Sequence, residues 1–387
     1  MLVSSASSTP DPIRMSAPLP ELKIRSALAD YSVAFSPLTD LSQWCPSADL
    51  LLVDAFFRGR LALPAGLPVI WIEATEEAKA LQETLPLFVA MKQAGLGRSS
   101  RIAAIGGGVV QDIATFVASL FMRGIRWSYV PTTFLGMADS CLGGKSSINV
   151  GPYKNLIGNF HPPSRIDILP VFARTLPAVE LAGGAAEAAK IAFCRGASTF
   201  AIYERLSAPV LSGAWQEQQL AELLHATLSV KQWFIETDEF DQAERRLLNF
   251  GHTWGHALES ATSFAIPHGL AVAIGMMASI CFTEHQPESA GLWQHCLALL
   301  RPVLDPEQLQ VFDAESFLKA FQADKKHSPG QYHLIVPSST DPAGLGVQEM
   351  QLPADQASLD AVLAAMQQAI AALEPELATA QSVRVAA

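Results

Sequence analysis

The chain has 387 residues, half of them hydrophobic and only 16% charged, so it can bury a large core and is not globally disordered. At roughly 150 residues per domain, this length predicts two domains with a cleft between them. The formal net charge is -11 and no block of Lys or Arg offsets it, which argues against nucleic acid as a partner.

Residues 1–20 are rich in Ser and Pro and lack the basic and apolar regions of a signal peptide, so we expect a disordered leader there. The five cysteines are scattered without a C-x-x-C pair. They fit neither a disulfide framework nor a thiolate zinc site, and they favour the cytoplasm. The apolar run 270–282 is shorter than the ~20 residues that span a bilayer. It indicates a buried helix, and no membrane partner is expected.

Short apolar runs alternate with helical patterns in the first half of the chain. We expect strands at 48–53, 68–72, 101–105 and 127–130, and helices at 75–94 and 109–121. This alternation predicts a parallel sheet packed with helices, in an α/β domain that we assign to residues 21–177. The polar, glycine-punctuated stretches between residues 139 and 158 are expected to form neither helix nor strand.

From about residue 181 the pattern changes to long segments rich in Ala and Leu, with few strand signals. Helices are expected at 182–193, 216–236, 253–262, 270–285, 290–300 and 358–373. We therefore place a domain boundary near Pro177, an α-helical domain at 178–374, and a flexible tail at 375–387.

Three glycines, Gly106 to Gly108, follow an expected strand and open a helix that contains Asp112. Such a turn lets backbone N–H groups meet a phosphate without side-chain obstruction. It is not the G-x-G-x-x-G fingerprint, and a tight turn without a ligand remains an alternative. Thr132 and Thr133 end the next strand, where open parallel sheets bind their ligands.

Arg123, Lys145 and Lys154 lie near glycine-rich turns and could bind a phosphorylated substrate, although lone basic residues are usually solvated. A second cluster has the spacing of a metal site. His252 and His256 lie one helical turn apart, His268 follows, and Glu187 precedes Lys190 by three residues. Three N/O ligands such as Glu187, His252 and His268 leave a coordination position open, although paired histidines are often only hydrogen-bonded.

A series of motifs between about residues 50 and 336 carries a family resemblance. The motifs are GGGVVQD, MRG, VPTT, MADSCLGGKSSIN, YKNLIGNF, TLPAVEL, AAEAAK, NFGHTWGH, PHG and ADKK. Their order and spacing resemble those of the 3-dehydroquinate synthases, within the sugar phosphate cyclase superfamily. The resemblance implies a Rossmann-like N-terminal domain, a helical C-terminal domain, NAD in the cleft between them, one zinc or cobalt ion, and a homodimer.

The resemblance also implies site residues. The metal ligands would be Glu187, His252 and His268, with His256 one turn beyond. The substrate positions would be Asp139, Lys145, Asn155, Lys190, Lys231, Arg245, Asn249 and Lys325, with Lys325 chosen over Lys326. Arg123 would reach the substrate phosphate, in its own or a neighbouring subunit. The NAD contacts would be Asp54, Glu76, Lys79, Gly107, Gly108, Asp112, Thr132, Thr133, Lys145, Lys154, Thr175 and Glu180.

The implied reaction converts 3-deoxy-arabino-heptulosonate 7-phosphate, a phosphorylated seven-carbon sugar acid, to 3-dehydroquinate, a step of the shikimate pathway to the aromatic amino acids. It is a phosphate-eliminating, carbon–oxygen lyase reaction without net redox change, because NAD+ accepts a hydride and later returns it. The family pattern is broken at Gln111, where a small residue is usual, at Ser146-Ser147 and at Phe56. Three alternatives remain: a specialised cyclase acting on sedoheptulose 7-phosphate or an amino analogue, a metal-dependent polyol dehydrogenase, and a noncatalytic NAD-binding protein.

Overall fold

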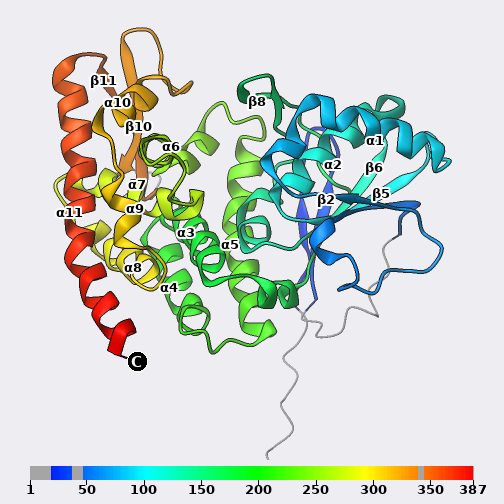
Figure 1. Ribbon diagram of the computed structural model, residues 1–387, viewed down its shortest axis with the longest axis horizontal. Coiled ribbons are helices and arrows are strands. Elements are labelled where there is room, and N and C mark those ends of the chain that lie inside the picture. Colours follow the sequence, from blue (N-terminus) through cyan, green and yellow to red (C-terminus); the bar gives the residue numbers. More distant parts are fainter. Residues whose placement is uncertain (1–18, 37–46, 339–343, 387) are drawn as a thin grey trace, which may run out of the picture.

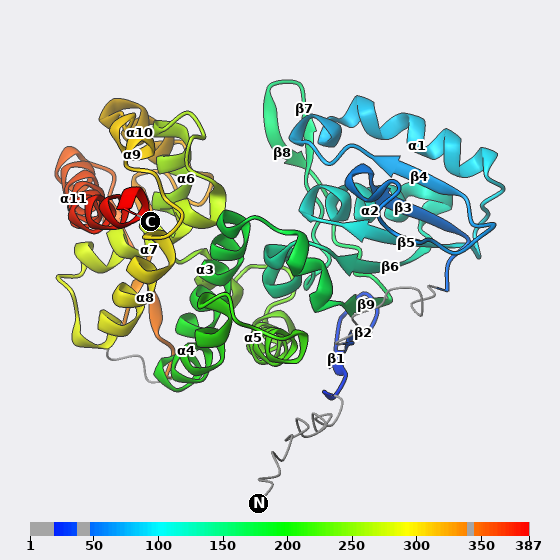
Figure 2. The ribbon, with the colours of Figure 1, turned by 60° about the horizontal axis from the view of Figure 1, so that its bottom comes forward.

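The structure, a computed structural model, describes residues 19–36, 47–338 and 344–386. A β-sheet with its helices, built by the first half of the chain, lies beside a bundle of helices built by the second half (Figures 1 and 2). The sequence predicts this fold class. Most of the expected leader, residues 1–18, lies outside the described residues. Within those residues, no helix combines the length and the apolar character that crossing a membrane requires.

Seven strands form the main sheet of the first half. They are β1 (Leu22–Ile24), β2 (Tyr31–Phe35), β3 (Leu50–Asp54), β4 (Val69–Ile72), β5 (Arg101–Gly106), β6 (Arg126–Pro131) and β9 (Arg165–Ile168). Their order is β1-β2-β9-β6-β5-β3-β4, and all neighbours run parallel except β1 and β2. The four expected strands are confirmed as β3 to β6, and the expected parallel pairing holds for them. The sequence analysis missed β1, β2 and β9.

Two α-helices accompany the sheet, α1 (Leu81–Gln93) and α2 (Gly108–Leu120). Helix α2 packs against β3, β5 and β6, and α1 contacts α2. The single helix expected at 75–94 is wrong at its start, because a 3-10 turn at Glu76–Lys79 and an extended Ala80 precede α1. This break lets the Lys79 side chain turn inward to an ion pair with Asp112, and that contact overrides the helical pattern.

The stretch between β6 and β9 is more regular than its composition suggests. It contains a π-helix at Gly136–Ser140 and a hairpin of β7 (Ile148–Val150) and β8 (Tyr153–Ile157). The expectation of neither helix nor strand is therefore wrong here. Gly151 supplies the left-handed conformation of the hairpin turn, with φ 58°.

Helices dominate the second half. They are α3 (Ala178–Cys194), α4 (Ala197–Leu211), α5 (Glu217–Thr237), α6 (His252–Ala261), α7 (His268–Phe282), α8 (Ala290–Leu300), α9 (Pro306–Gln310), α10 (Ala314–Gln322) and α11 (Gln356–Ala386). Helix α7 is buried from Gly269 to Cys281 and packs against α3, α6, α8 and α11. Its apolar run is thus a central core helix, as predicted.

The second half also departs from the expectations. Helices α4, α9 and α10 were missed, as was the hairpin of β10 (Gln331–Pro337) and β11 (Val347–Pro353). The last helix does not end at residue 373 but continues as α11 through Pro375 to Ala386, along the outer edge of the molecule (Figure 1). Pro375 removes one backbone hydrogen bond, and Leu377, only 1% exposed, packs the next turn onto the core.

Candidate active site

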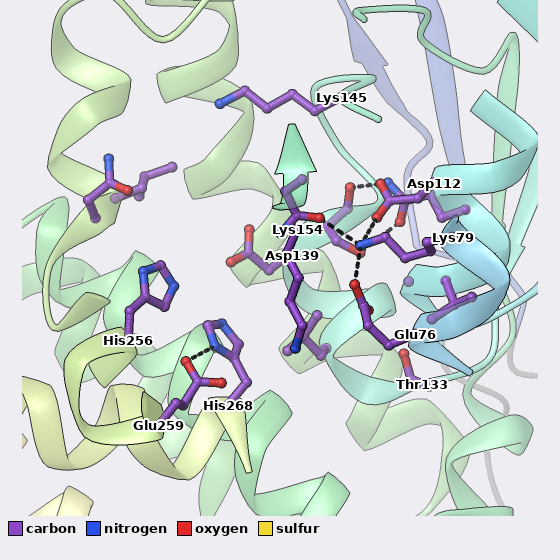
Figure 3. Close-up of a pocket in the computed structure, with 18 of the residues that line it drawn as sticks. Glu76, Lys79, Asp112, Thr133, Asp139, Lys145, Lys154, His256, Glu259 and His268 are labelled. Atoms are coloured by element: carbon purple, nitrogen blue, oxygen red, sulfur yellow. Dashed lines mark hydrogen bonds and ion pairs between the residues drawn. The ribbon is translucent and has the colours of Figure 1, made fainter. Parts of the chain in front are cut away.

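A cavity of about 920 Å³ opens between the two halves. The glycine turn after β5 and the β7–β8 hairpin line it on one side, and residues of α3, α5, α6 and α7 line it on the other. Its volume falls in the usual range of small-molecule sites. Figure 3 shows Lys79 and Asp112 facing His256 and His268 across the cavity, with Asp139 between them.

The glycine turn brings backbone close to the cavity. A Cβ on Gly106 would lie 2.5 Å from Val110 Cγ2, and one on Gly107 would lie 2.8 Å from Thr133 Cγ2, so side chains at either position would clash. Gly108 and Val109, in the first turn of α2, line the cavity. The unpaired N–H groups and the positive end of the helix dipole therefore face a position suited to a phosphate.

Lys79 is the centre of a polar network beside this turn. Its Nζ lies 3.0 Å from Asp112 Oδ2, 2.9 Å from Asn155 Oδ1 and 3.5 Å from Glu76 Oε1. Asp112 Oδ1 also accepts a hydrogen bond from the backbone of Ser147 at 3.1 Å. Burial raises the pKa of the Asp112 carboxyl to about 6, against the opposing effect of Lys79. The network ties the 3-10 turn, α2 and the hairpin into one wall of the cavity.

Asp139 lies on the π-helix and holds two ammonium groups. Lys190 Nζ from α3 is 3.1 Å from its Oδ2, and Lys231 from α5 pairs with both its Oδ1 and its backbone carbonyl. Burial raises the pKa of the Asp139 carboxyl, but Lys190 and Lys231 outweigh it and hold that pKa well below its usual range. Asp139 is therefore charged and joins the sheet half to two helices of the other half.

Glu187, His252 and His268 converge as the resemblance implies. Glu187 Oε1 is buried without a hydrogen-bond partner, and it lies 3.6 Å from His252 Nε2 and 3.5 Å from His268 Nε2. Its other oxygen pairs with Lys190. An unsatisfied buried carboxylate oxygen that faces two imidazole nitrogens fits a divalent cation that all three would bind.

The Nδ1 atoms of His252 and His268 are hydrogen-bonded to other groups of the chain. His268 Nδ1 lies 3.2 Å from Glu259 Oε2, and His252 Nδ1 lies 3.2 Å from the Phe250 carbonyl oxygen. Both oxygens accept a hydrogen bond from Nδ1–H, which leaves each neutral imidazole with a lone pair on Nε2, the nitrogen nearer Glu187. Metal-binding histidines are commonly oriented in this way.

His256 adds a third imidazole to the cluster. The ligand atoms of His252, His256 and His268 all lie within 4.8 Å of one another, so these three histidines form a second candidate set of ligands. We favour the set with Glu187, since that set supplies a negative charge and satisfies the unpaired Oε1. Burial lowers the pKa of His256 to about 4, so its imidazole is neutral near pH 7.

The two lysines after α10 differ in orientation. Lys325 is exposed, whereas Lys326 is largely buried and pairs with Asp324 at 2.5 Å. Burial lowers the pKa of both His252 and His256, and the charge of Lys326 contributes to each shift in the same direction. Neither lysine is among the residues that line the cavity, so the choice of Lys325 made from the sequence stays a prediction. Because the Lys326 backbone N–H donates to Asp324 Oδ1 at 3.0 Å, we infer that Lys326 is the better candidate.

Replacing Lys326 with methionine is expected to lower kcat/KM by roughly 10- to 100-fold, because it removes a positive charge that acts on His252 and His256. Lys325→Met is the matched control and should stay within about twofold of wild type. Steady-state kinetics of the two variants would check this. Equal effects would mean that Lys326 has no role that its neighbour lacks.

Arg245 and Lys145 form the basic side of the cavity. Arg245 is 6% exposed, and its guanidinium covers Gly143 so closely that a Cβ there would lie 2.2 Å from Nη2. Lys145 Nζ pairs with Asp241 at 2.6 Å, which bridges the two halves. Asn249 lines the cavity and donates to the Arg246 carbonyl at 2.9 Å.

The structure does not bring every predicted residue to the cavity. Glu180, Lys154, Asn155 and Thr133 line it, and Lys154 lies 4.2 Å from the centroid of the Phe264 ring. Several others lie elsewhere. Asp54 accepts from the Phe56 backbone, Thr175 donates to the Phe172 carbonyl, Thr132 is buried, and Arg123 is exposed beyond α2.

Sequence reasoning missed two carboxylates of the site. Glu259 lies seven residues after His252 on α6, a spacing that places both on one helix face and could have revealed it. Asp241 follows α5 in a loop with φ 61° and gave no periodic signal. Two residues that depart from the family pattern lie outside this group of carboxylates. Phe56 is 46% exposed, and the Ser146 hydroxyl donates a hydrogen bond to Asn159 Oδ1 at 2.6 Å.

Comparisons with known proteins agree with this geometry. The family model described as 3-dehydroquinate synthase N-terminal matches residues 69–183, and the one described as 3-dehydroquinate synthase C-terminal matches residues 184–327. A 3-dehydroquinate synthase from Geobacter metallireducens is 38% identical over 283 residues, which cover 73% of this chain and 76% of the relative. A 3-dehydroquinate synthase from a Sulfurovum species is 33% identical over 301 residues, which cover 77% of this chain and 82% of the relative.

Solved structures share the fold. The structure of ValA, a 2-epi-5-epi-valiolone synthase from Streptomyces hygroscopicus with NAD+ and Zn2+ bound, has a TM-score of 0.71 and 27% identity, over 92% of this chain and 99% of ValA. A probable glycerol dehydrogenase from Sinorhizobium meliloti, with a TM-score of 0.53 and 14% identity over 83% of this chain and 90% of the other, shares the fold alone. Since two consecutive family models and relatives above 30% identity cover most of its length, the chain belongs to the 3-dehydroquinate synthase family.

Proposed function

We propose that this chain is a 3-dehydroquinate synthase, which converts 3-deoxy-arabino-heptulosonate 7-phosphate to 3-dehydroquinate and phosphate. The observation that carries the proposal is the convergence on one cavity of a glycine turn suited to a dinucleotide and a Glu–His–His cluster suited to a metal. A buried arginine, Arg245, faces the same cavity. Hydride chemistry, Lewis-acid chemistry and anion recognition would thus act on one bound substrate.

NAD and one zinc or cobalt ion are the proposed cofactors. Gly107, Gly108, Lys79, Asp112 and Thr133 would hold the dinucleotide, and Glu187, His252 and His268 would hold the metal. When bound, NAD would accept and return a hydride and the metal would polarise substrate oxygens. The NAD+ and Zn2+ bound to ValA support this assignment. Nitrogen and carboxylate donors suit either metal.

The chain's own residues position the substrate and its protons. Arg245 and Asn249 would bind the carboxylate, with Lys145 beside them. Of the two ammonium groups on Asp139, Lys190 has its pKa raised by Asp139 and Glu187 against the effect of burial, whereas burial lowers the pKa of Lys231. Lys231 would therefore give up a proton more readily, and Lys190 would chiefly stabilise negative charge.

Arg123 supports a homodimer as part of the proposal. It is exposed, it does not line the cavity of its own chain, and both it and Met122 have positive φ. If Arg123 reaches a substrate phosphate, as the resemblance implies, it would do so in a neighbouring copy. We also propose a cytoplasmic location, which fits the buried, unpaired Cys141, Cys194, Cys281 and Cys296.

Binding of NAD+ is expected to weaken on acidification, with a midpoint near pH 6. Above that pH the Asp112 carboxylate is charged and pairs with Lys79, and below it the carboxyl is neutral and the pair is lost. Titration calorimetry of NAD+ between pH 5 and 8 would measure the change. Asp112→Asn should bind NAD+ weakly at every pH in this range, with metal content unchanged. An unaltered pH dependence in that variant would exclude Asp112 as its origin.

A specialised cyclase acting on sedoheptulose 7-phosphate is the second candidate, favoured by the likeness to ValA. The two substrates differ at the carboxylate, which only the heptulosonate carries. Inorganic phosphate release should be assayed with each heptulose phosphate as the only substrate. We expect the fastest release from the carboxylated heptulosonate, and faster release from sedoheptulose 7-phosphate would favour the specialised cyclase.

A further inference from the structure

Gln111 makes an unusual pair of contacts beside the cavity. It is 4% exposed and lies in the first turn of α2. Its Nε2 donates to the Ser140 carbonyl oxygen at 2.6 Å, and the Ser140 hydroxyl donates to its Oε1 at 2.7 Å. The carboxamide thus holds both the backbone and the side chain of one residue.

Ser140 is the last residue of the π-helix that carries Asp139. Such a turn is rare, and its carbonyl groups do not all pair within the helix. On the other side of Asp139, Lys231 binds the Asp139 carbonyl and carboxylate, and Lys190 binds the carboxylate. Asp139 is therefore held by ammonium groups from the helical half and, through Ser140, by Gln111 from the sheet half.

The neighbouring residue on α2, Asp112, contacts a different set of residues. Asp112 binds Lys79 and the Ser147 backbone, on the side proposed for the dinucleotide. Adjacent residues of one helix turn thus connect to separate parts of the cavity. A change at Gln111 should act on the Asp139 side without breaking the Asp112 side.

We propose that Gln111 is a positioning residue for the reaction, which fixes Asp139 between Lys190 and Lys231 through its two hydrogen bonds to Ser140. This inference rests on the proposed function, since it assigns Asp139 and its lysines to the site of turnover. The small residue that the resemblance implies for this position could not make these bonds. This chain would thus hold Asp139 in place by a contact that the usual small residue cannot provide.

Gln111→Met tests the proposal, because methionine has a similar length and volume and lacks both hydrogen-bonding groups. We expect kcat to fall about 10-fold or more, since small misplacements of reacting groups are costly. KM, the Kd of NAD+ and metal content should stay within about twofold. Thr115→Val, which removes a hydroxyl bonded to the Gln111 carbonyl of its own helix, is the control and should leave kcat unchanged.

The pair can be tested as a unit with Ser140→Ala. If Gln111 acts only through Ser140, the double variant should lose no more kcat than Gln111→Met alone. An unchanged kcat in Gln111→Met, or a double loss equal to the product of the two single losses, would overturn the proposal. If the wild type prefers sedoheptulose 7-phosphate, the same variants are compared on that substrate. The test of Gln111 then stands while the substrate assignment fails.

Discussion

Arg245→Ala is expected to lower kcat/KM for the heptulosonate phosphate by roughly 30-fold to 1,000-fold, which corresponds to ~2 to 4 kcal/mol of transition-state binding. The side chain is buried, and its guanidinium packs on Gly143 at the cavity wall. A carboxylate bound there would form a partly desolvated pair, and removing one partner of such a pair costs more than removing one partner of an exposed pair. Steady-state kinetics with the carboxylated substrate would measure the loss.

Arg246 provides the matched control for this prediction. Its guanidinium pairs with Glu349 at 3.0 Å, and its side chain is 35% exposed, so it belongs to the surface. Arg246→Ala should change kcat/KM by no more than about threefold. Similar losses of kcat/KM in the two variants would contradict carboxylate recognition. So would a rate on sedoheptulose 7-phosphate that exceeds the heptulosonate rate and is unaffected by Arg245→Ala.

The His268→Ala variant is expected to lose the bound metal and most of its turnover. It removes one of the three proposed metal ligands and leaves the buried Glu187 Oε1 facing His252 alone. Metal content by elemental analysis, and activity before and after EDTA treatment, would show the loss. In the wild type, zinc or cobalt should restore the activity that EDTA removes.

Glu259→Gln gives a graded version of the same test. Its carboxylate orients His268 through Nδ1, so its loss should weaken metal binding by roughly 10- to 100-fold without removing a ligand. His285→Ala, at an exposed position after α7, is the control and should retain the metal. Full metal occupancy together with full activity in His268→Ala would remove His268 from the site.

The sequence predicted those parts of the fold that have a strong local signal. Strands β3 and β5 and the long helix α7 are largely apolar runs that are buried along most of their length, which gives them a clear pattern. Strands β1 and β9 are short; β1 lies at the edge of the sheet and β9 lies between β2 and β6, so their assignment depends on pairing with distant residues. The π-helix and the extended Ala80 depend in the same way on tertiary contacts around Asp139 and Lys79.

The residues of the site divide in the same way, into those that have a local sequence signal and those whose position depends on tertiary contacts. The spacing of His252 and His256, together with the family motifs, indicated the metal cluster before any geometry was known. Side-chain direction could not be read in the same way. Lys326 is partly buried and pairs with Asp324, whereas Lys325 is exposed, and the sequence alone does not distinguish these two adjacent lysines. Asp241 reaches Lys145 only because the two halves meet across the cavity.

The central claim is tested most directly by measuring phosphate and NADH in one reaction, with NAD+ present at a small fraction of the substrate concentration. The 3-dehydroquinate synthase reaction that we propose for this cavity predicts a cycle in which the hydride is returned. Many phosphate ions should therefore appear for each NAD+, with no accumulation of NADH absorbance. Formation of one NADH for each product, with turnover ending when NAD+ is exhausted, would instead identify a polyol dehydrogenase and contradict the account.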